Sequence, residues 1–213
     1  MEENMRKLYE IKVEKIIKNL ERNNMRGVYL KNKGELTSFF DKNIKTNETV
    51  STGGSTTISE LDIISYLKTR DIVFLDRYEK GLSSEEKEEL YRNSLLSDSY
   101  ITSTNAITEK GYLYNVDGTG NRVAAMIYGP KKVFVIAGVN KIVYDTEEAI
   151  IRVRSVAAPA NAIRLNLNTP CTKTGECMDC QVDDRICNEY TLIKRQNKKD
   201  RITVIFLPEN LGY

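Results

Sequence analysis

All four cysteines of the chain lie in one polar segment, CTKTGECMDCQVDDRIC, and the chain contains no histidine. Their spacing is C-x5-C-x2-C-x6-C, at Cys171, Cys177, Cys180 and Cys187. Two thiolates separated by two residues can bind one metal ion, and two more thiolates can complete a tetrahedral site. The single C-x2-C unit matches neither a zinc ribbon nor the repeated C-x2-C of bacterial ferredoxins. The pattern therefore predicts a metal site that would hold zinc or an iron–sulfur cluster.

Structural or redox-active thiols are an alternative to this metal site. Four cysteines can form disulfides in three connectivities. A catalytic thiolate is less favoured, because no imidazole is available and only Lys173, Arg185 or a helix amino terminus could lower the thiol pKa. In each case we expect the cysteine segment to hold the chain between the last helix and the C-terminal strands.

A glycine pair in VSTGGSTTISEL marks a second candidate site. Gly53 and Gly54 lie between a predicted strand and a predicted helix, where glycine brings backbone amides close to an anion and the helix terminus adds favourable potential. Ser55 and Thr56 add hydroxyl donors. The segment lacks the Walker and dinucleotide-binding patterns, so it predicts a phosphate, carboxylate or similar ligand, and a plain strand-to-helix turn remains an alternative.

The segment NAITEKGYLYNVDGTGNRVAAM is more polar and turn-prone than a simple connection requires, and long polar loops are often functional. Glu109 could act as a base or nucleophile if burial raised its pKa, and Arg122 could clamp a carboxylate or phosphate. Alternatively, Arg122 pairs with a neighbouring acid. Lys141 follows a strand, where it could contact an anion or lie in solvent. The predicted ligand-binding residues are Gly53, Gly54, Ser55, Thr56, Asn105, Asp117, Gly118, Asn121, Arg122 and Lys141, with Glu109 as the catalytic candidate.

The elements that would position these residues alternate along the chain. Apolar residues at helical spacing predict a helix over 1–24, and apolar strands such as DIVFLD, SYITS and KKVFVIAG alternate with further helices. This order predicts a three-layer α/β/α fold with a mostly parallel sheet, followed by a cysteine-rich loop at 171–187 and a β-hairpin at 188–213. Because such sheets bind ligands at the carboxyl ends of their strands, we expect STGGS, NAITEKG and AGVNK to meet at one edge.

Composition excludes several classes of protein. The 213 residues, 40% apolar and 29% charged, are typical of one soluble domain spanning 1–213, and no segment approaches the roughly 20 apolar residues of a membrane span. A net charge of +2 does not indicate the broad positive surface that would bind nucleic acid. The amino terminus resembles no secretory or transit signal, which predicts a cytoplasmic protein. Without histidine, serine–histidine and cysteine–histidine nucleophiles are excluded.

Several long motifs resemble the LUD family of lactate-utilization proteins, formerly a domain of unknown function. They are STGGS, LDRY, NAITEKGYLYNVDGTGNRVAAMIYGPKKV, AGVNKIV and PCTKTGECMDC with DRICN, and the resemblance covers nearly the whole chain. It implies the fold shared by ribose-5-phosphate isomerase and the CoA-transferases. In some members it also implies a link to oxidation of L-lactate to pyruvate alongside iron–sulfur oxidoreductase subunits. In CoA-transferases a glutamate beside a glycine-rich turn is the nucleophile, and Glu109 is a loose analogue.

These observations predict a LUD-family lactate-utilization protein that binds a small anionic metabolite or cofactor and is linked to lactate or hydroxy-acid oxidation. One alternative is an enzyme resembling a CoA-transferase or a sugar-phosphate isomerase that uses Glu109. Another is a metal-binding redox or interaction module. Whether the protein is an enzyme stays open, as does assembly with iron–sulfur partner subunits or into a homo-oligomer.

Overall fold

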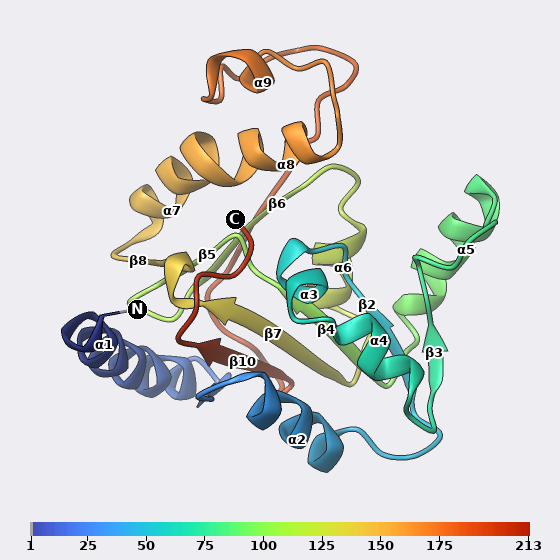
Figure 1. The fold of residues 1–213 in the computed structure, drawn as a ribbon, viewed down its shortest axis with the longest axis vertical. Helices are drawn as coiled ribbons and strands as arrows, with labels where there is room; N and C mark the ends of the chain where they lie inside the picture. The colour runs from blue at the N-terminus through green and yellow to red at the C-terminus, as the bar shows by residue number, and fades with distance from the viewer. Residues whose placement is uncertain (1) are drawn as a thin grey trace.

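The computed structural model describes residues 2–213. A six-stranded parallel sheet with strand order β1-β10-β7-β4-β2-β3 forms its centre (Figure 1). The strands are β1 (Arg26–Tyr29), β2 (Thr49–Thr52), β3 (Val73–Leu75), β4 (Ser99–Ser103), β7 (Lys132–Gly138) and β10 (Ile202–Leu207). Along β10, Val204 and Phe206 face one apolar cluster whereas Ile205 and Leu207 face another. Both faces of the sheet are therefore buried, as apolar parallel strands require.

Helices cover the two faces of this sheet and confirm the three-layer arrangement. On one face lie α1 (Glu3–Arg22) and α6 (Asn121–Ile127), and on the other lie α2 (Lys33–Asn43), α3 (Thr56–Glu60) and α4 (Ile63–Lys68). The helix predicted over 1–24 corresponds to α1, and Met1 lies outside the described residues. Helix α5 (Ser84–Ser94) projects beyond the β3 edge (Figure 1). Within residues 2–213 no helix is both long and apolar enough to cross a membrane.

A second, smaller sheet was not predicted. Its order is β8-β5-β6-β9, with β5 (Ala106–Thr108), β6 (Leu113–Asp117), β8 (Ile142–Val143) and β9 (Glu189–Ile193). Helices α7 (Thr146–Arg152) and α8 (Ala158–Arg164), joined by a π-helical turn (Val153–Ala157), pack on it. The segment that we interpreted as a long polar loop thus contains two short buried strands, whose few residues between glycines gave too little periodicity to detect.

The hairpin predicted over 188–213 is wrong. Strand β9 pairs antiparallel with β6 in the small sheet, whereas β10 lies between β1 and β7 in the large one. Every residue of β10 is buried, and a strand that is apolar on both faces is stable at the centre of a covered sheet rather than in a surface hairpin. The basic segment 194–201 connects the two sheets.

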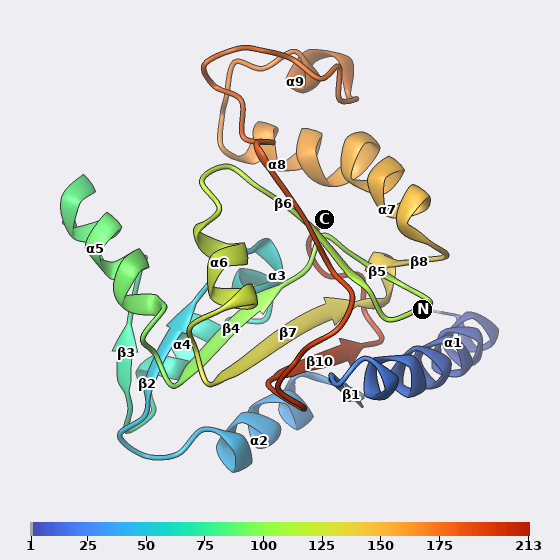
Figure 2. The ribbon, with the colours of Figure 1, turned by 180° about the vertical axis from the view of Figure 1, so that it is seen from behind.

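The cysteine segment lies above α8, on the side away from the large sheet (Figure 2). It begins with the short helix α9 (Cys171–Thr174) and returns to the small sheet at β9. Strand β4 lies between β2 and β7, so the carboxyl ends of these three strands are adjacent. The 3₁₀ turn η1 (Val139–Lys141) follows β7 at this edge, and α3 follows β2.

Candidate functional site: a cavity at the carboxyl edge of the sheet

A cavity of about 300 Å³ lies at the carboxyl ends of the central strands and extends to α8. Ten residues were predicted to bind ligand, and all except Gly53 line this cavity: Gly54, Ser55, Thr56, Asn105, Asp117, Gly118, Asn121, Arg122 and Lys141. The three predicted turns thus meet at one edge of the sheet, although not every side chain has the surroundings that we expected.

The two glycines of the STGGS turn have different roles. A Cβ atom on Gly53 would lie 2.6 Å from Thr102 Oγ1 and 2.9 Å from Tyr100 Oη, so packing beneath the cavity requires glycine there. A Cβ atom on Gly54 would lie 3.3 Å from the guanidinium group of Arg77. Gly54 therefore leaves room for an arginine that motif analysis did not select.

Arg122 is committed to protein acceptors. Its Nε donates to Asp117 Oδ1 at 2.8 Å, and its Nη1 donates to Ser103 O at 2.9 Å and Asn115 Oδ1 at 2.7 Å. Its Nη2 donates to Asn105 Oδ1 at 2.8 Å and to Asp117 Oδ1 at 2.5 Å. The second interpretation from the sequence, pairing with a neighbouring acid, is the geometry found. Arg122 holds the cavity wall together rather than presenting free donors to a ligand.

Glu109 is separated from the cavity. Strand β5 carries the chain from Asn105, which lines the cavity, to Glu109, a span of roughly 10 Å for three strand residues. There Glu109 accepts a hydrogen bond from Lys15 Nζ at 2.7 Å and pairs with Lys12 at 3.5 Å. The hydrogen bond from Lys15 lowers the pKa of Glu109, whereas the catalytic prediction required burial to raise it. In this position Glu109 links the β5–β6 turn to α1.

Lys141 is buried at the cavity wall. Lys141 is 2% exposed. Its Nζ donates to Thr57 Oγ1 at 2.9 Å and to Ser103 Oγ at 2.8 Å. Burial, together with the positive charges of Arg152 and Arg122, lowers the pKa of Lys141 to about 7. The sequence signal was available, because this lysine stands between apolar Val139 and Ile142, but it does not distinguish a buried lysine from a solvated one.

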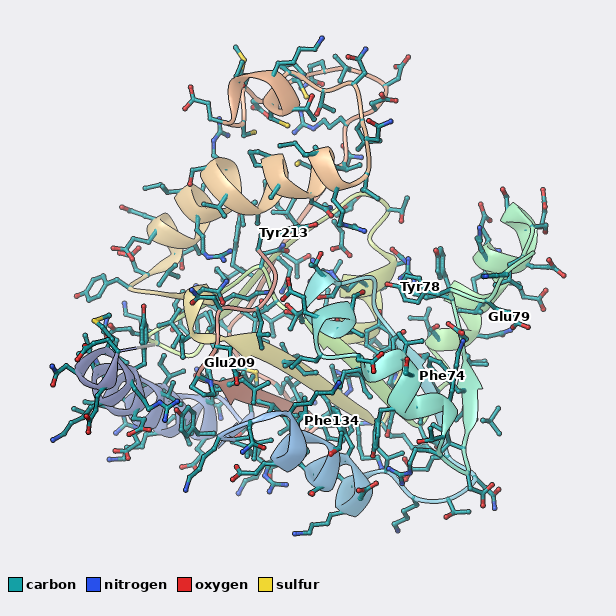
Figure 3. The ribbon with its side chains drawn as sticks, viewed as in Figure 1. Phe74, Tyr78, Glu79, Phe134, Glu209 and Tyr213 are labelled. Atoms are coloured by element: carbon teal, nitrogen blue, oxygen red, sulfur yellow. The ribbon has the colours of Figure 1, made fainter. Side chains whose placement is uncertain are left out.

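Other cavity residues were missed by sequence analysis. Arg77 follows β3 at the same edge, stacks on the Tyr91 ring with its Cζ 4.6 Å from the centroid, and donates to Tyr91 Oη at 2.9 Å. The carboxyl-end rule, applied to LDRY, would have found it. Tyr213 lies between α8 and α3 in the view of Figure 3 and lines the cavity, and its hydroxyl is buried without a hydrogen-bond partner. The Thr56 Oγ1 atom is likewise buried and without a partner.

The side chains around the cavity carry an excess of positive charge. Arg77, Arg122 and Arg164 line it as permanent positive charges beside the partly neutral Lys141, and Asp117 is the only acidic side chain among the described lining residues. Asp117 is already neutralised by Arg122, and its second oxygen accepts the Val123 amide at 3.0 Å. The cavity therefore suits a small molecule that bears a negative charge.

The four cysteines surround a second cavity, of about 20 Å³, beside Ala158 and Ala162 of α8. All four are free thiols, and residues 2–213 contain no group of three or more potential ligands arranged to hold a metal ion. The Asp179 amide donates to Cys177 Sγ at 3.4 Å, and Thr169 Oγ1 lies 3.2 Å from Cys171 Sγ. Four thiols on one cavity are donors that suit zinc or an iron–sulfur cluster, although in the described residues they are not grouped as ligands of one ion.

Burial, with smaller contributions from the neighbouring thiols, raises the pKa of Cys187 to about 11. A thiol with this pKa is almost entirely protonated near neutral pH, so it is a poor nucleophile.

The fold and the cavity together define a three-layer α/β protein with a cavity at the carboxyl edge of its parallel sheet. Residues 13–207 match the LUD domain, and the chain belongs to the LUD family. The chain is also similar to a solved structure, the crystal structure of a DUF162 family protein from Deinococcus radiodurans, and DUF162 is the former name of LUD. The TM-score is 0.54 and the identity 11%, over 94% of this chain and 98% of that one, which shows the fold alone. No curated protein matches the chain.

Proposed function

We propose that this LUD-domain protein binds a small anionic metabolite or cofactor in the carboxyl-edge cavity and serves the oxidation of lactate or a related hydroxy acid. The observation that carries the anionic ligand is the excess of positive side chains around the cavity, with one neutralised acid among them. The link to hydroxy-acid oxidation rests on family membership.

Two features of the cavity support an oxygen-rich ligand. Arg77 donates one hydrogen bond within the protein, to Tyr91, so its other guanidinium donors are available at the cavity wall. Thr56 Oγ1 and Tyr213 Oη are buried polar atoms that lack partners in the described residues. Leaving such an atom unpaired costs about 1–3 kcal/mol, which rotation of the side chain toward a ligand carboxylate or phosphate would recover.

A transferase or isomerase that uses Glu109 is less well supported. Such an enzyme needs a free carboxylate beside its substrate, and Glu109 is bound by Lys15 and Lys12 outside the cavity. Asp117 lines the cavity but is occupied by Arg122.

The test of anion binding compares Arg77→Met with Arg195→Met, a control that removes one exposed positive charge elsewhere. Lactate, pyruvate and inorganic phosphate would be titrated into each protein by calorimetry at low and moderate salt. We expect Arg77→Met to weaken the best-bound anion about tenfold or more, since charge-assisted hydrogen bonds contribute about 1.5–3 kcal/mol. The control should bind as the unmodified protein does. Equal affinities in both variants, or no binding of any anion, would reject the proposal.

A metal-binding role for the cysteine segment is the second candidate, favoured by the convergence of all four thiols on one cavity. The cavity volume of about 20 Å³ is close to that of one water molecule on the same measure, about 10–15 Å³, which favours a single ion such as zinc over a cubane cluster. Such an ion would join α9 to the start of β9 and so stabilise the segment over α8.

Metal analysis of anaerobically purified protein tests this second candidate. One zinc per chain that is lost in Cys177→Ser, and kept in the neighbouring control Met178→Leu, would support it. A brown protein with visible absorption would indicate an iron–sulfur cluster in place of zinc. Four alkylatable thiols and no bound metal would exclude both.

A further inference from the structure

We infer that Lys141 is a nucleophile that forms an imine with the carbonyl carbon of a small anionic carbonyl compound held in the carboxyl-edge cavity. The inference rests on the proposed function, since it concerns the ligand of the same cavity. Two classes of ligand combine a carbonyl group with an anionic group. They are the 2-oxo acids, whose anionic group is a carboxylate, and the phosphorylated aldehydes, whose anionic group is a phosphate.

Three adjacent strands supply the surroundings of the amine. Thr57 is in α3 after β2, Ser103 ends β4, and Lys141 ends the turn after β7. Thr57 Oγ1 donates its own proton to Leu211 O at 3.2 Å, and Ser103 Oγ donates to Thr104 O at 3.4 Å. Both hydroxyls therefore accept hydrogen bonds from Lys141.

This pattern matches a neutral amine. A neutral amino group has two N–H bonds and one lone pair, and the two hydroxyl acceptors use both N–H bonds. The lone pair is then left at the wall of the cavity that Lys141 lines. A protonated lysine would present a third N–H, for which the described residues supply no acceptor.

The charges that face Lys141 also favour the neutral amine. Arg122 on α6 and Arg152 on α7 oppose protonation, whereas Glu60 on α3 favours it more weakly than either. No carboxylate of residues 2–213 forms an ion pair with Lys141. With burial, these charges place the lysine among the activated amines that attack carbonyl groups.

The step needs only the lysine, the carbonyl compound and one proton from solvent, and it involves no change of oxidation state. The Nζ lone pair attacks the carbonyl carbon, a C–N bond forms, and the carbonyl π electrons move to oxygen, which takes the proton released by nitrogen. Loss of this hydroxyl as water, with a proton supplied by solvent, leaves the protonated imine. Arg77, whose guanidinium has donors not used within the protein, lines the same cavity, where it can hold the anionic group.

Reductive trapping tests the inference. The full chain is incubated with pyruvate or with glycolaldehyde phosphate and cyanoborohydride at pH values from 6 to 10, and its peptides are then mapped by mass spectrometry. Hydride addition to the imine carbon leaves a stable secondary amine on the labelled lysine. At pH 7 roughly a thousandfold more of Lys141 than of an ordinary lysine is neutral, so its peptide should be labelled first.

Lys131 is the internal control, since its hydrogen bond with Asp98 raises its pKa. Labelling of Lys141 should be half-maximal near pH 7, saturate with probe, and decrease when lactate, an anion without a carbonyl group, competes. Lys141→Arg should abolish this label, whereas Lys131→Arg should not. If Lys141→Arg folds poorly, the inference is still tested by the pH profile of Lys141 labelling, measured on peptides of the unmodified protein.

The outcomes separate this inference from the proposed function. Labelling of Lys141 no faster than of Lys131, in a protein that still binds anions through Arg77, overturns the imine and leaves the receptor. Failure of both labelling and anion binding overturns both. Labelling by pyruvate alone identifies a 2-oxo acid, and labelling by glycolaldehyde phosphate alone identifies a phosphorylated aldehyde.

Discussion

Lys15 and Lys141 are lysines in opposite surroundings. The side chain of Lys15 is 63% exposed and bonds to the carboxylate of Glu109, whose hydrogen bond raises the lysine pKa. Lys141 is buried, contacts two hydroxyl groups, and has a pKa lowered to about 7 by burial. The same amine is thus kept charged at the surface, whereas in the cavity its basicity is lowered enough for a large fraction to be neutral, and so nucleophilic, near neutral pH. The difference lies in burial and in the presence of a carboxylate.

The comparison applies equally to Glu109. Its pKa is lowered by the hydrogen bond from Lys15, so the carboxylate is a weak base and a weak nucleophile. An acid that looks catalytic in the sequence is therefore deactivated by its partner, whereas a lysine that looks solvated is activated. The following predictions test this contrast in decreasing order of effect.

The largest effect is expected from the pH dependence of Lys141→Met, which replaces the amine with a neutral side chain. Because the folded lysine has a pKa of about 7 and the unfolded one about 10.5, the unfolded state binds more protons between these pH values. The unmodified protein should therefore gain about 1.4 kcal/mol per pH unit relative to the variant from pH 7 to 10, and nothing further below pH 7.

Urea unfolding of both proteins from pH 6 to 10 measures this difference. Other groups that titrate in the range are common to both proteins, so they cancel. The lost hydrogen bonds to Thr57 and Ser103 shift the difference by a constant and leave its slope. A difference that does not change with pH would show that Lys141 has an ordinary pKa.

A second prediction concerns Arg122, one of the charges that face Lys141. Arg122→Met leaves the 6% exposed carboxylate of Asp117 without its partner, and unpairing a buried charge costs about 3–5 kcal/mol. Loss of the positive charge that faces Lys141 should also move the labelling of Lys141 to higher pH. Chemical denaturation gives the loss of stability, with Arg195→Met as a control expected within about 0.5 kcal/mol of the parent. A loss below about 1 kcal/mol would mean that Arg122 does not hold the cavity wall.

The features that were predicted correctly from the sequence are those that depend on residues close together in the chain. Apolar strands that alternate with helices indicated the parallel sheet, and Ser83 and Glu86 form the capping box expected of their spacing. Thr57 and Glu60 have the same spacing but form no capping box, because Ser55 is the N-cap of α3 and the Thr57 hydroxyl accepts a hydrogen bond from Lys141 instead. Both segments have the local pattern, and only a contact 84 positions away distinguishes them.

The candidate site, like the fold, was predicted only where its position depends on local sequence features. The carboxyl-end rule located the cavity and brought nine of the ten predicted ligand-binding residues to its lining, because it depends only on strand direction. It placed Glu109 wrongly, since the intervening β5 was not recognised and α1 supplies the lysines that bind it. It could not find Tyr213, which reaches the cavity only because β10 lies in the large sheet.

A third prediction tests the backbone that positions Lys141. A Cβ atom on Gly138 would lie 2.5 Å from Glu209 O and 2.7 Å from Leu211 N, both main-chain atoms that cannot move independently. Gly138→Ala should therefore destabilise the protein by about 1–3 kcal/mol and slow the labelling of Lys141. Gly118→Ala is the control, since its Cβ atom would lie no closer than 3.7 Å to another residue. Thermal unfolding that is equal in the two variants would refute this packing.

The smallest effect is expected at Glu109, and it is the sharpest test of the contrast. Glu109→Gln removes an ion pair whose lysine is 63% exposed, so stability should fall by less than about 1 kcal/mol, and by less at high salt. Because the pKa of Glu109 is lowered, this contribution is present above pH 4.5 and is lost as the pH falls below it. Stability curves for Glu109→Gln and the parent should therefore converge in acid.

Lys15→Met is the matched variant, because it removes the other half of the same pair. In both variants the labelling of Lys141 and the affinity for anions should equal those of the parent, since neither Lys15 nor Glu109 lines the cavity. If Glu109→Gln abolished either property while Lys15→Met preserved it, the carboxylate would reach the ligand. Glu109 rather than Lys141 would then be the reactive group. The contrast between Lys15 and Lys141 would then concern protein stability and not reactivity.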